Sequence, residues 1–337
     1  MRCIEIQKFG LDGLGMAERA DPTPGHGEVL VRVGASSINF RDLMMLRGMY
    51  NPKQKLPLIP NSDGAGTVAA VGPGVTRFRE GDRVAGIFSQ GWLAGPPARE
   101  KMTATLGSPL DGMLTELRAL NQDGLVHTPK HLSDEEAACL PCAGVTAWSA
   151  LVEHGAIKPG DTVLLQGTGG VSIFALQFAK LAGARVIITS SSDEKLAQAG
   201  KLGADEIINY KTTPDWDKKA RELTGGAGVD HIVEVGGGGT FGKSLRAIRI
   251  GGTISVIGVL TGATTDTSLI PVLMQNLRLQ GIMVGSREMF EHMNGALSLA
   301  GIKPVIDRVF PFEEAAQAFA HMASGAHFGK IVVKISR

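Results

Sequence analysis

The sequence is poor in cysteine, in aromatic residues and in net charge. Its three cysteines are too few for a disulfide framework, which indicates a reducing compartment, so we expect a cytoplasmic protein. The 34 Lys and Arg residues balance 33 Asp and Glu to a formal charge of +1. Bulk electrostatics therefore gives no reason to expect a nucleic acid or an anionic membrane as partner. No uncharged apolar run reaches the ~18 residues that a bilayer-spanning helix needs.

Glycine is the residue in excess, with 45 copies, and its share is nearly twice the usual ~7%. Hydrophobic residues make up 43% of the chain and charged residues 20%, a balance typical of a globular protein rather than a disordered one. At roughly 150 residues per domain, the length favours two domains. The glycines indicate many tight turns and close backbone approaches.

The pattern of apolar residues changes near residue 130. Residues 1 to about 125 contain short β-branched runs, at 28–35, 66–71 and 82–87, separated by turn clusters. Ser133 followed by three acidic residues is a helix N-cap, opening a helix towards His154. Strands and helices then alternate from 162 to about 285, which is typical of a parallel sheet with helices on both faces.

The expected fold is therefore α/β, with a doubly wound Rossmann domain at 131–286. The final strand KIVVKI has no obvious place in the series of strands and helices. We therefore expect segment 287–337 to return to an N-terminal, mostly β domain of residues 1–130.

A glycine-rich loop follows the strand TVLLQ and precedes a helix. Its residues are Gly167, Thr168, Gly169, Gly170 and Val171. Glycine permits the tight turn and lets backbone N–H groups approach a pyrophosphate at the positive end of the helix. The alternative is that the glycines only punctuate a turn, but the strand before and the helix after favour a dinucleotide site.

The residues after the next strand favour NADP(H) over NAD(H). An NAD site normally places a carboxylate there, on the ribose hydroxyls, whereas this strand ends in Ser190, Ser191 and Ser192, with Asp193 and Lys195 beyond. Hydroxyls and a lysine suit a 2′-phosphate. Two alternatives stay open for Asp193: it bends back to a ribose, or it caps the following helix.

Ordered motifs span nearly the whole chain: SINFRD at 37–42, PNSDGAG at 60–66, GDRV at 81–84, LPCAGVTAW at 140–148, the glycine loop, and HFGKIV at 327–332. Together they resemble the medium-chain dehydrogenase/reductase superfamily, nearest its zinc-independent quinone oxidoreductase-like and zinc-type alcohol dehydrogenase-like members. The resemblance implies a GroES-like β domain, a Rossmann domain and a nicotinamide in the cleft. It also implies a homodimer joined through the Rossmann sheet edge at 251–285.

The same resemblance implies cofactor contacts. For the 2′-phosphate it implies Ser190 or Ser191, Lys195 and Tyr210, and Tyr210 also fits independently because it directly follows the third strand. For the rest of the cofactor it implies residues at strand ends and in the preceding helix: Thr146, Gly236, Ile257, Val259, Leu260, Val284, Ser286 and Lys330.

The sequence departs from the zinc enzymes of this superfamily. They resemble this chain but carry Cys at the site of Asn39, a His-Glu pair at Ser62-Asp63, and Cys or Asp at Cys142. A catalytic zinc needs three good ligands, and this chain offers at most Asp63 and Cys142. Segment 89–114 also lacks the four cysteines of a structural zinc lobe. Cys139 and Cys142 form one C-x-x-C, which is more typical of two buried thiols than of a redox or metal motif. No metal is expected.

Without a Lewis acid, hydrogen-bond donors must stabilise the charge on the substrate oxygen. Quinones and α,β-unsaturated carbonyls accept hydride at carbon and spread the charge onto such an oxygen. Related enoyl reductases carry a proton-donating tyrosine at the position that Tyr50 resembles, and Asn39 replaces a metal ligand that would face the oxygen. The alternatives are an aromatic cover of a turn for Tyr50 and a helix cap for Asn39.

The leading prediction is an NADPH-dependent oxidoreductase acting on a small-molecule quinone, enone or aldehyde. An alcohol or aldehyde dehydrogenase is the second hypothesis, and a non-catalytic NADPH-binding protein is the third. Metal content and turnover of alcohols against enones separate the first two, whereas tight NADPH binding without turnover of any acceptor identifies the third.

Overall fold

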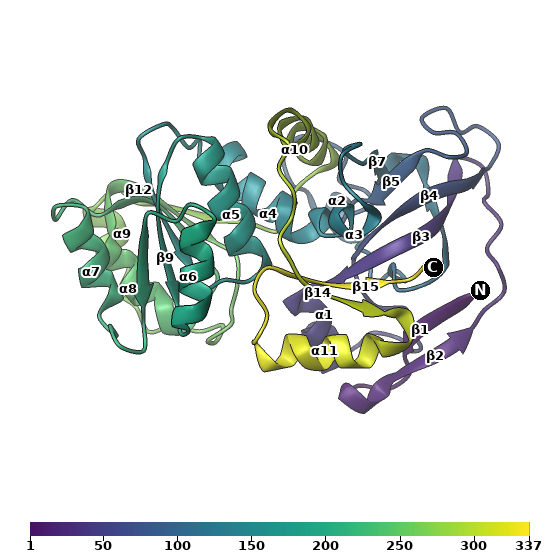
Figure 1. The fold of residues 1–337 in the computed structure, drawn as a ribbon, viewed down its shortest axis with the longest axis horizontal. Helices are drawn as coiled ribbons and strands as arrows, with labels where there is room; N and C mark the ends of the chain where they lie inside the picture. Colours follow the sequence, from purple (N-terminus) through teal and green to yellow (C-terminus); the bar gives the residue numbers. More distant parts are fainter. Residues whose placement is uncertain (337) are drawn as a thin grey trace. The chain divides into compact units, whose positions relative to one another are not determined.

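The computed structural model describes residues 1–336 and divides the chain into two compact units. Unit 1 consists of residues 1–145 and 284–336, and unit 2 of Thr146–Met283. Figure 1 shows the fold and labels most of their helices and strands. No helix among residues 1–336 combines the length and the apolar composition needed to cross a membrane.

Unit 1 is built on a mixed sheet with the order β14-β15-β3-β4-β5-β7, from which β6 branches by pairing with β3. All its strand pairs are antiparallel except β14 with β15. The strands are β1 (Arg2–Ile6), β2 (Leu14–Glu18), β3 (Glu28–Ile38), β4 (Asp63–Val71), β5 (Arg83–Gly86), β6 (Leu117–Asn121), β7 (Leu125–His127), β14 (Ile306–Pro311) and β15 (Lys330–Lys334). The helices are α1 (Phe40–Leu46), α2 (Arg99–Met102), α3 (Asp134–Ala137), α10 (Arg287–Ala300) and α11 (Ala315–Ser324).

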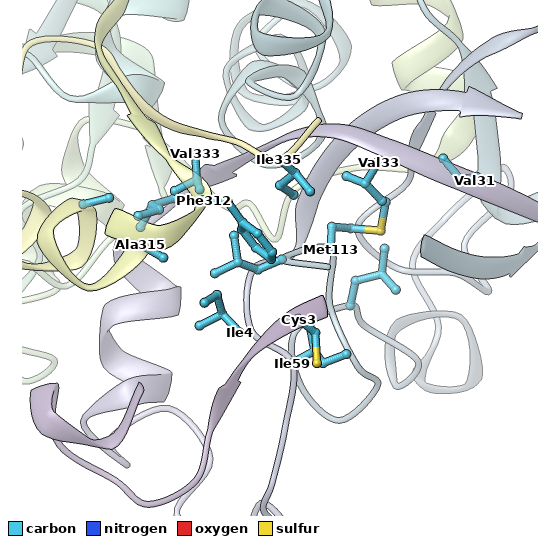
Figure 2. Close-up of a cluster of buried hydrophobic side chains, with 14 of the residues drawn as sticks. Cys3, Ile4, Val31, Val33, Ile59, Met113, Phe312, Ala315, Val333 and Ile335 are labelled. Carbon is cyan, nitrogen blue, oxygen red and sulfur yellow. The ribbon is translucent and has the colours of Figure 1, made fainter. Parts of the chain in front are cut away.

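The C-terminal tail completes this sheet. β15 pairs antiparallel with β3, with Ile331 opposite Ile38, and β14 pairs parallel with β15. Apolar side chains of β1 and β3 pack with those of the tail in one core, which Figure 2 shows for Ile4, Val33, Phe312 and Val333. Residues about 300 positions apart in the sequence are thereby fixed side by side.

Segment 131–145, which the sequence assigned to the Rossmann domain, lies in unit 1. Its helix α3 packs against β3, β4 and β15, and Arg83 binds Asp134 at 2.6 Å. Ser133 is the expected N-cap, with its hydroxyl accepting a hydrogen bond from the Glu136 N–H. An N-cap marks where a helix begins and not where a domain begins. The helix therefore begins at Asp134, whereas unit 2 begins at Thr146.

Unit 2 is a six-stranded parallel sheet with the order β10-β9-β8-β11-β12-β13, the arrangement of a dinucleotide-binding doubly wound fold. Its strands are β8 (Thr162–Gln166), β9 (Arg185–Ser190), β10 (Glu206–Asn209), β11 (Val229–Glu234), β12 (Ile248–Val256) and β13 (Arg278–Gly281). Its helices are α4 (Val145–Trp148), α5 (Gly170–Leu181), α6 (Asp193–Lys201), α7 (Trp216–Leu223), α8 (Gly238–Ala247) and α9 (Ile270–Met274). The predicted combination of a mostly β domain with a doubly wound parallel sheet is confirmed.

Candidate active site

The carboxyl ends of the unit 2 strands form one edge of the sheet. In register, Gln166 of β8 lies beside Thr189 of β9, and Asn209 of β10 lies beside Ser190. On the other side, Glu234 of β11 lies beside Val256 of β12. The loops predicted from the sequence to hold a cofactor all leave from these strand ends, so the sheet gathers them along a single edge.

The glycine loop has the backbone shape that an anion site needs. Gly167 has φ +69°, and a Cβ there would meet no atom of the chain within 4 Å. Gly169 is the N-cap of α5 and supplies no side-chain cap. The Ser172 hydroxyl donates to the Gln166 carbonyl at 2.7 Å and so holds the loop against β8. The loop leads into a twelve-residue helix, and the N–H dipoles at the start of such a helix favour a bound anion.

The adenosine end of this edge is formed by the turns after β9 and β10. Ser190 is buried, and its carbonyl accepts from the Tyr210 N–H at 3.0 Å, so the structure brings these two predicted residues together. Ser191 follows Ser190 directly, and Lys195 lies in the first two turns of α6. Ser192, not Asp193, is the N-cap of α6, and the Asp193 carboxylate accepts from Asn209 at 2.7 Å.

A buried carboxylate, Glu234, holds the loops after β8 and β11. Its Oε1 accepts from the N–H groups of Gly236 and Gly237, both at 2.9 Å, and from the Thr240 hydroxyl at 2.6 Å. Its Oε2 accepts from the Gln166 amide at 2.7 Å and from the Ser244 hydroxyl. Gln166 directly precedes the glycine loop, so Glu234 ties that loop to the predicted cofactor residue Gly236.

The other predicted cofactor residues divide between the units. Thr146 is buried in α4, and the backbone of Ile257 donates to the Glu234 carbonyl at 2.9 Å in unit 2. Val259 and Leu260 follow Ile257 in the chain, in the turn after β12, and both are exposed. Three more residues belong to unit 1: Val284, with φ +57°, Ser286, which caps α10, and Lys330.

In unit 1, Asn39 stands between β3 and α1 and is 8% exposed. It is the N-cap residue of α1, and its backbone N–H donates to the Asp42 carboxylate at 2.8 Å. Its side-chain Oδ1 accepts from the Lys330 ammonium at 2.5 Å, whereas its Nδ2 is buried without a hydrogen-bond partner among the described residues. Asn39 is therefore a helix cap, which was the alternative hypothesis for this residue, and it also carries an amide N–H donor without a partner among the described residues.

The Lys330 ammonium also lies near Asp63, one of the two residues at the positions of the His-Glu pair that the sequence comparison with zinc enzymes identified. Its Nζ lies 3.7 Å from the Asp63 carboxylate, which in turn accepts from the hydroxyls of Ser37 at 3.2 Å and Ser62 at 2.8 Å. Lys330 and Asp63 are both buried. Each of these two buried charges therefore has a partner of opposite sign, and the Asp63 oxygens also accept hydrogen bonds, so the cost of burying the pair is offset.

Tyr50 lies after α1 with its ring over a buried guanidinium. The Arg41 Cζ is 4.7 Å from the centre of the Tyr50 ring and 5.1 Å from that of Phe88. Burial alone would lower the pKa of Arg41, but the Asp42 carboxylate, 3.2 Å away, keeps it above its ordinary value. Arg41 is therefore a permanent cation beside the phenol that the sequence proposed as proton donor.

These donors do not fit zinc. Burial raises the pKa of the Cys142 thiol, and the nearby Asp63 carboxylate raises it further, whereas zinc binds the thiolate. The Lys330 cation faces Asp63, the other acidic candidate. Among residues 1–336, no three or more His, Cys, Asp or Glu side chains are grouped so as to hold a metal ion.

Comparison with known proteins agrees with both halves of the fold. Residues 25–130 match the model of the alcohol dehydrogenase GroES-like domain, and residues 170–299 match that of the zinc-binding dehydrogenases. A zinc-type alcohol dehydrogenase-like protein of Schizosaccharomyces pombe is 46% identical over 92% of this chain and 91% of its own length. The chain belongs to the medium-chain dehydrogenase/reductase superfamily.

Two solved structures extend the comparison. A putative alcohol dehydrogenase from Sinorhizobium meliloti is 44% identical, with TM-score 0.93 over 99% of this chain and 98% of that one. The Escherichia coli quinone oxidoreductase complexed with NADPH is 26% identical, with TM-score 0.85 over 99% and 100%. The protein is thus an oxidoreductase that uses a nicotinamide cofactor.

Three features of the site escaped the sequence. Glu234 carried a signal, since a lone carboxylate ending an apolar strand before four glycines is unusual. Arg41 was noted in the sequence only as part of the motif SINFRD, and nothing in the sequence indicated its contact with the Tyr50 ring. The bond between Lys330 and Asn39 joins residues 291 positions apart, and no local pattern could indicate it.

Proposed function

We propose that this protein is an NADPH-dependent reductase of quinones or α,β-unsaturated carbonyls, and that donors of unit 1 bind the substrate oxygen. The observation that carries the proposal is Asn39, whose buried Nδ2 donates to no described residue. A buried donor without a partner costs about 1–3 kcal/mol. A substrate oxygen accepting from it removes that cost when the substrate binds.

In the proposed reaction, Asn39, Tyr50 and Arg41 each have a different role. The bound cofactor supplies the hydride. Asn39 orients the acceptor through its oxygen and stabilises the negative charge that develops there. The Tyr50 hydroxyl delivers the proton that completes reduction, and the Arg41 cation under its ring stabilises the phenolate left behind.

The preference for NADPH rests on the turns after β9 and β10. Asn209 engages the Asp193 carboxylate at 2.7 Å, which draws it away from a ribose. Ser190, Ser191, Lys195 and Tyr210 supply hydroxyls and a cation for a 2′-phosphate. Replacing Lys195 by Ala should reduce the NADPH:NADH ratio of kcat/KM about tenfold. An unchanged ratio contradicts the assignment.

The test of the reaction is oxidation of NADPH by 1,2-naphthoquinone, trans-2-alkenals and simple aldehydes, with metal content measured on the same sample. Tyr50→Phe should lower kcat about a hundredfold and leave the Kd of NADPH unchanged, because only proton delivery is lost. Tyr210→Phe is the matched control, since Tyr210 is equally exposed and should change cofactor affinity rather than kcat. The proposal fails if no quinone or enone is reduced.

A second candidate is an alcohol or aldehyde dehydrogenase. The names of the Schizosaccharomyces and Sinorhizobium relatives favour it. The same assays decide, because efficient oxidation of simple alcohols with slow enone reduction supports this candidate over the first.

We also propose that the protein is a homodimer. β13 pairs only with β12 among the described strands and so leaves an open edge. The adjacent helix α9 exposes four apolar side chains, with Leu273 76% exposed, the others being Leu269, Ile270 and Met274. An open edge beside an apolar patch indicates a partner surface. Leu273→Glu should convert a dimer to a monomer in sedimentation velocity, whereas a monomeric parent protein contradicts the proposal.

A further inference from the structure

The bond between Lys330 and Asn39 is the least expected contact of unit 1. Lys330 begins β15 and is 2% exposed. Its ammonium donates to the Asn39 Oδ1 at 2.5 Å and to the Ile38 carbonyl at 3.1 Å. Taking an ammonium out of water is costly, so these acceptors and the Asp63 carboxylate, at 3.7 Å, are what keep it in place.

The bond fixes which way the amide faces. Because an ammonium only donates, it must meet the carbonyl oxygen of the Asn39 amide and not its NH₂ group. Nδ2 is therefore directed away from Lys330, and it has no partner among the described residues. The backbone of Asn39 is fixed as well, since its N–H donates to Asp42. The free donor is held in one orientation by contacts at both ends of the residue.

The bond also polarises the amide. A cation on the oxygen of an amide draws electron density from its nitrogen, so the N–H groups become stronger donors. In a buried site this effect is larger than in water, because the effective dielectric is lower. Lys330 can thus act on a substrate oxygen without touching it.

We propose that Lys330 is a positioning residue for the hydride acceptor, acting through Asn39 rather than by contacting the cofactor. This rests on the proposed function, in which Asn39 binds the acceptor oxygen. It reassigns Lys330, which the sequence had placed with the cofactor. The Lys330 ammonium contacts Asn39 and lies near Asp63, which occupy positions where the zinc enzymes carry metal ligands. In this proposal it makes the Asn39 amide a stronger hydrogen-bond donor.

The test is a double-mutant cycle with Lys330→Met and Asn39→Ala, measured with NADPH and an enone. Lys330→Met should lower kcat about tenfold to a hundredfold, as loss of a residue supporting a catalytic group does. In the Asn39→Ala background the same change should have almost no further effect, because the group that it acts through is gone. The Kd of NADPH should stay within about twofold in all variants. Lys330→Arg, which keeps the charge, should recover part of kcat.

Two further variants control for nonspecific effects of removing a lysine and for loss of folding. Lys334→Met removes a half-exposed lysine of the same strand, paired with Glu135, and should leave kcat unchanged. Should Lys330→Met not fold because Asp63 loses its partner, Lys330→Met/Asp63→Asn removes both buried charges and should show the same loss of kcat.

The outcomes separate the two proposals. Additive losses of kcat in the double variant overturn the role of Lys330 and leave the reductase proposal standing. A large rise in the Kd of NADPH for Lys330→Met, with kcat intact, likewise overturns it and returns Lys330 to the cofactor. If the parent protein binds NADPH but reduces no acceptor, the proposed function falls and the role of Lys330 falls with it.

Discussion

The two units hold their functional residues in opposite ways. Unit 2 presents loops at consecutive strand ends, and the glycine loop offers backbone, with Gly167 at φ +69° and open space beyond it. Unit 1 gathers side chains from distant segments, with Asn39, Asp63 and Lys330 in one buried cluster. A dinucleotide is recognised by backbone shape, which a short motif can encode, whereas charge on a substrate is controlled by side chains that only the tertiary fold assembles.

Each unit also buries a carboxylate, and the two differ in what holds them. Glu234 accepts five hydrogen bonds from neutral donors, so its role is to fix loops. Asp63 has two hydroxyl donors and a cation 3.7 Å away, so its role is to balance charge. Changes in unit 2 should therefore mainly affect the free energy of unfolding, and changes in unit 1 should mainly affect the electrostatics of its buried cluster.

The largest expected effect is on the stability of unit 2. Glu234→Ala removes the acceptor of five donors, three of them on the buried residues Gln166, Gly236 and Ser244, and should lower the free energy of unfolding by roughly 3–5 kcal/mol. Glu206→Ala is the control, because Glu206 is partly exposed and pairs with Arg185 at 2.8 Å, a contact worth about 0–1 kcal/mol. Urea unfolding of both variants measures the difference. Equal losses would show that Glu234 does not hold the loops.

The next effect concerns the chemistry of unit 1. Asn39→Asp keeps an acceptor for Lys330 but removes the free N–H donor, so the cluster should remain folded while kcat falls about 10²–10³-fold. Stopped-flow reduction of an enone, together with the melting temperature, measures both properties. Retained kcat would contradict a donor role for Asn39, since the carboxylate of Asp has no N–H group to donate.

The same contrast explains what the sequence could predict. The alternation of strands and helices gave the parallel sheet of unit 2, because periodicity reports burial on each element. The glycine loop was predicted because its backbone shape depends on a few consecutive residues after β8. The return of the tail to β3 followed from a strand with no place in the series, although no pattern specified its register.

The site of unit 1 was predicted residue by residue but not as a unit. Asn39 and Tyr50 were singled out, yet the partner of each was missed, because the contacts of Lys330 and Arg41 depend on geometry that sequence spacing does not record. Lys330 was assigned to the cofactor by resemblance, and only its bond to Asn39 suggests another role. Pairing between distant buried charges depends on tertiary packing, which local propensity does not determine.

A smaller effect tests whether the glycine loop serves the cofactor. Gly167 and Gly160 both have positive φ, +69° and +88°, and open space at the Cβ position. Replacing either by Ala should therefore cost similar stability, about 1 kcal/mol. Only Gly167→Ala should also raise the Kd of NADPH, by about tenfold, because its methyl group enters the space assigned to the pyrophosphate. Fluorescence titration of NADPH checks this, and equal Kd values for the two variants would remove the phosphate assignment.

The smallest effect concerns two of the three thiols of unit 1, those of Cys139 and Cys142, which report the balance of charge around Lys330. Burial raises the pKa of Cys139 to about 12 and raises that of Cys142, where Asp63 adds to burial and Lys330 opposes it. Both thiols should therefore be protonated at neutral pH and should react with iodoacetamide more than about tenfold slower than a free thiol. Asp63→Asn should speed the reaction of Cys142 and Lys330→Met should slow it further, because these changes remove charges of opposite sign. Mass spectrometry of the labelled protein separates the two cysteines, and equal rates in both variants would show that neither charge acts on Cys142.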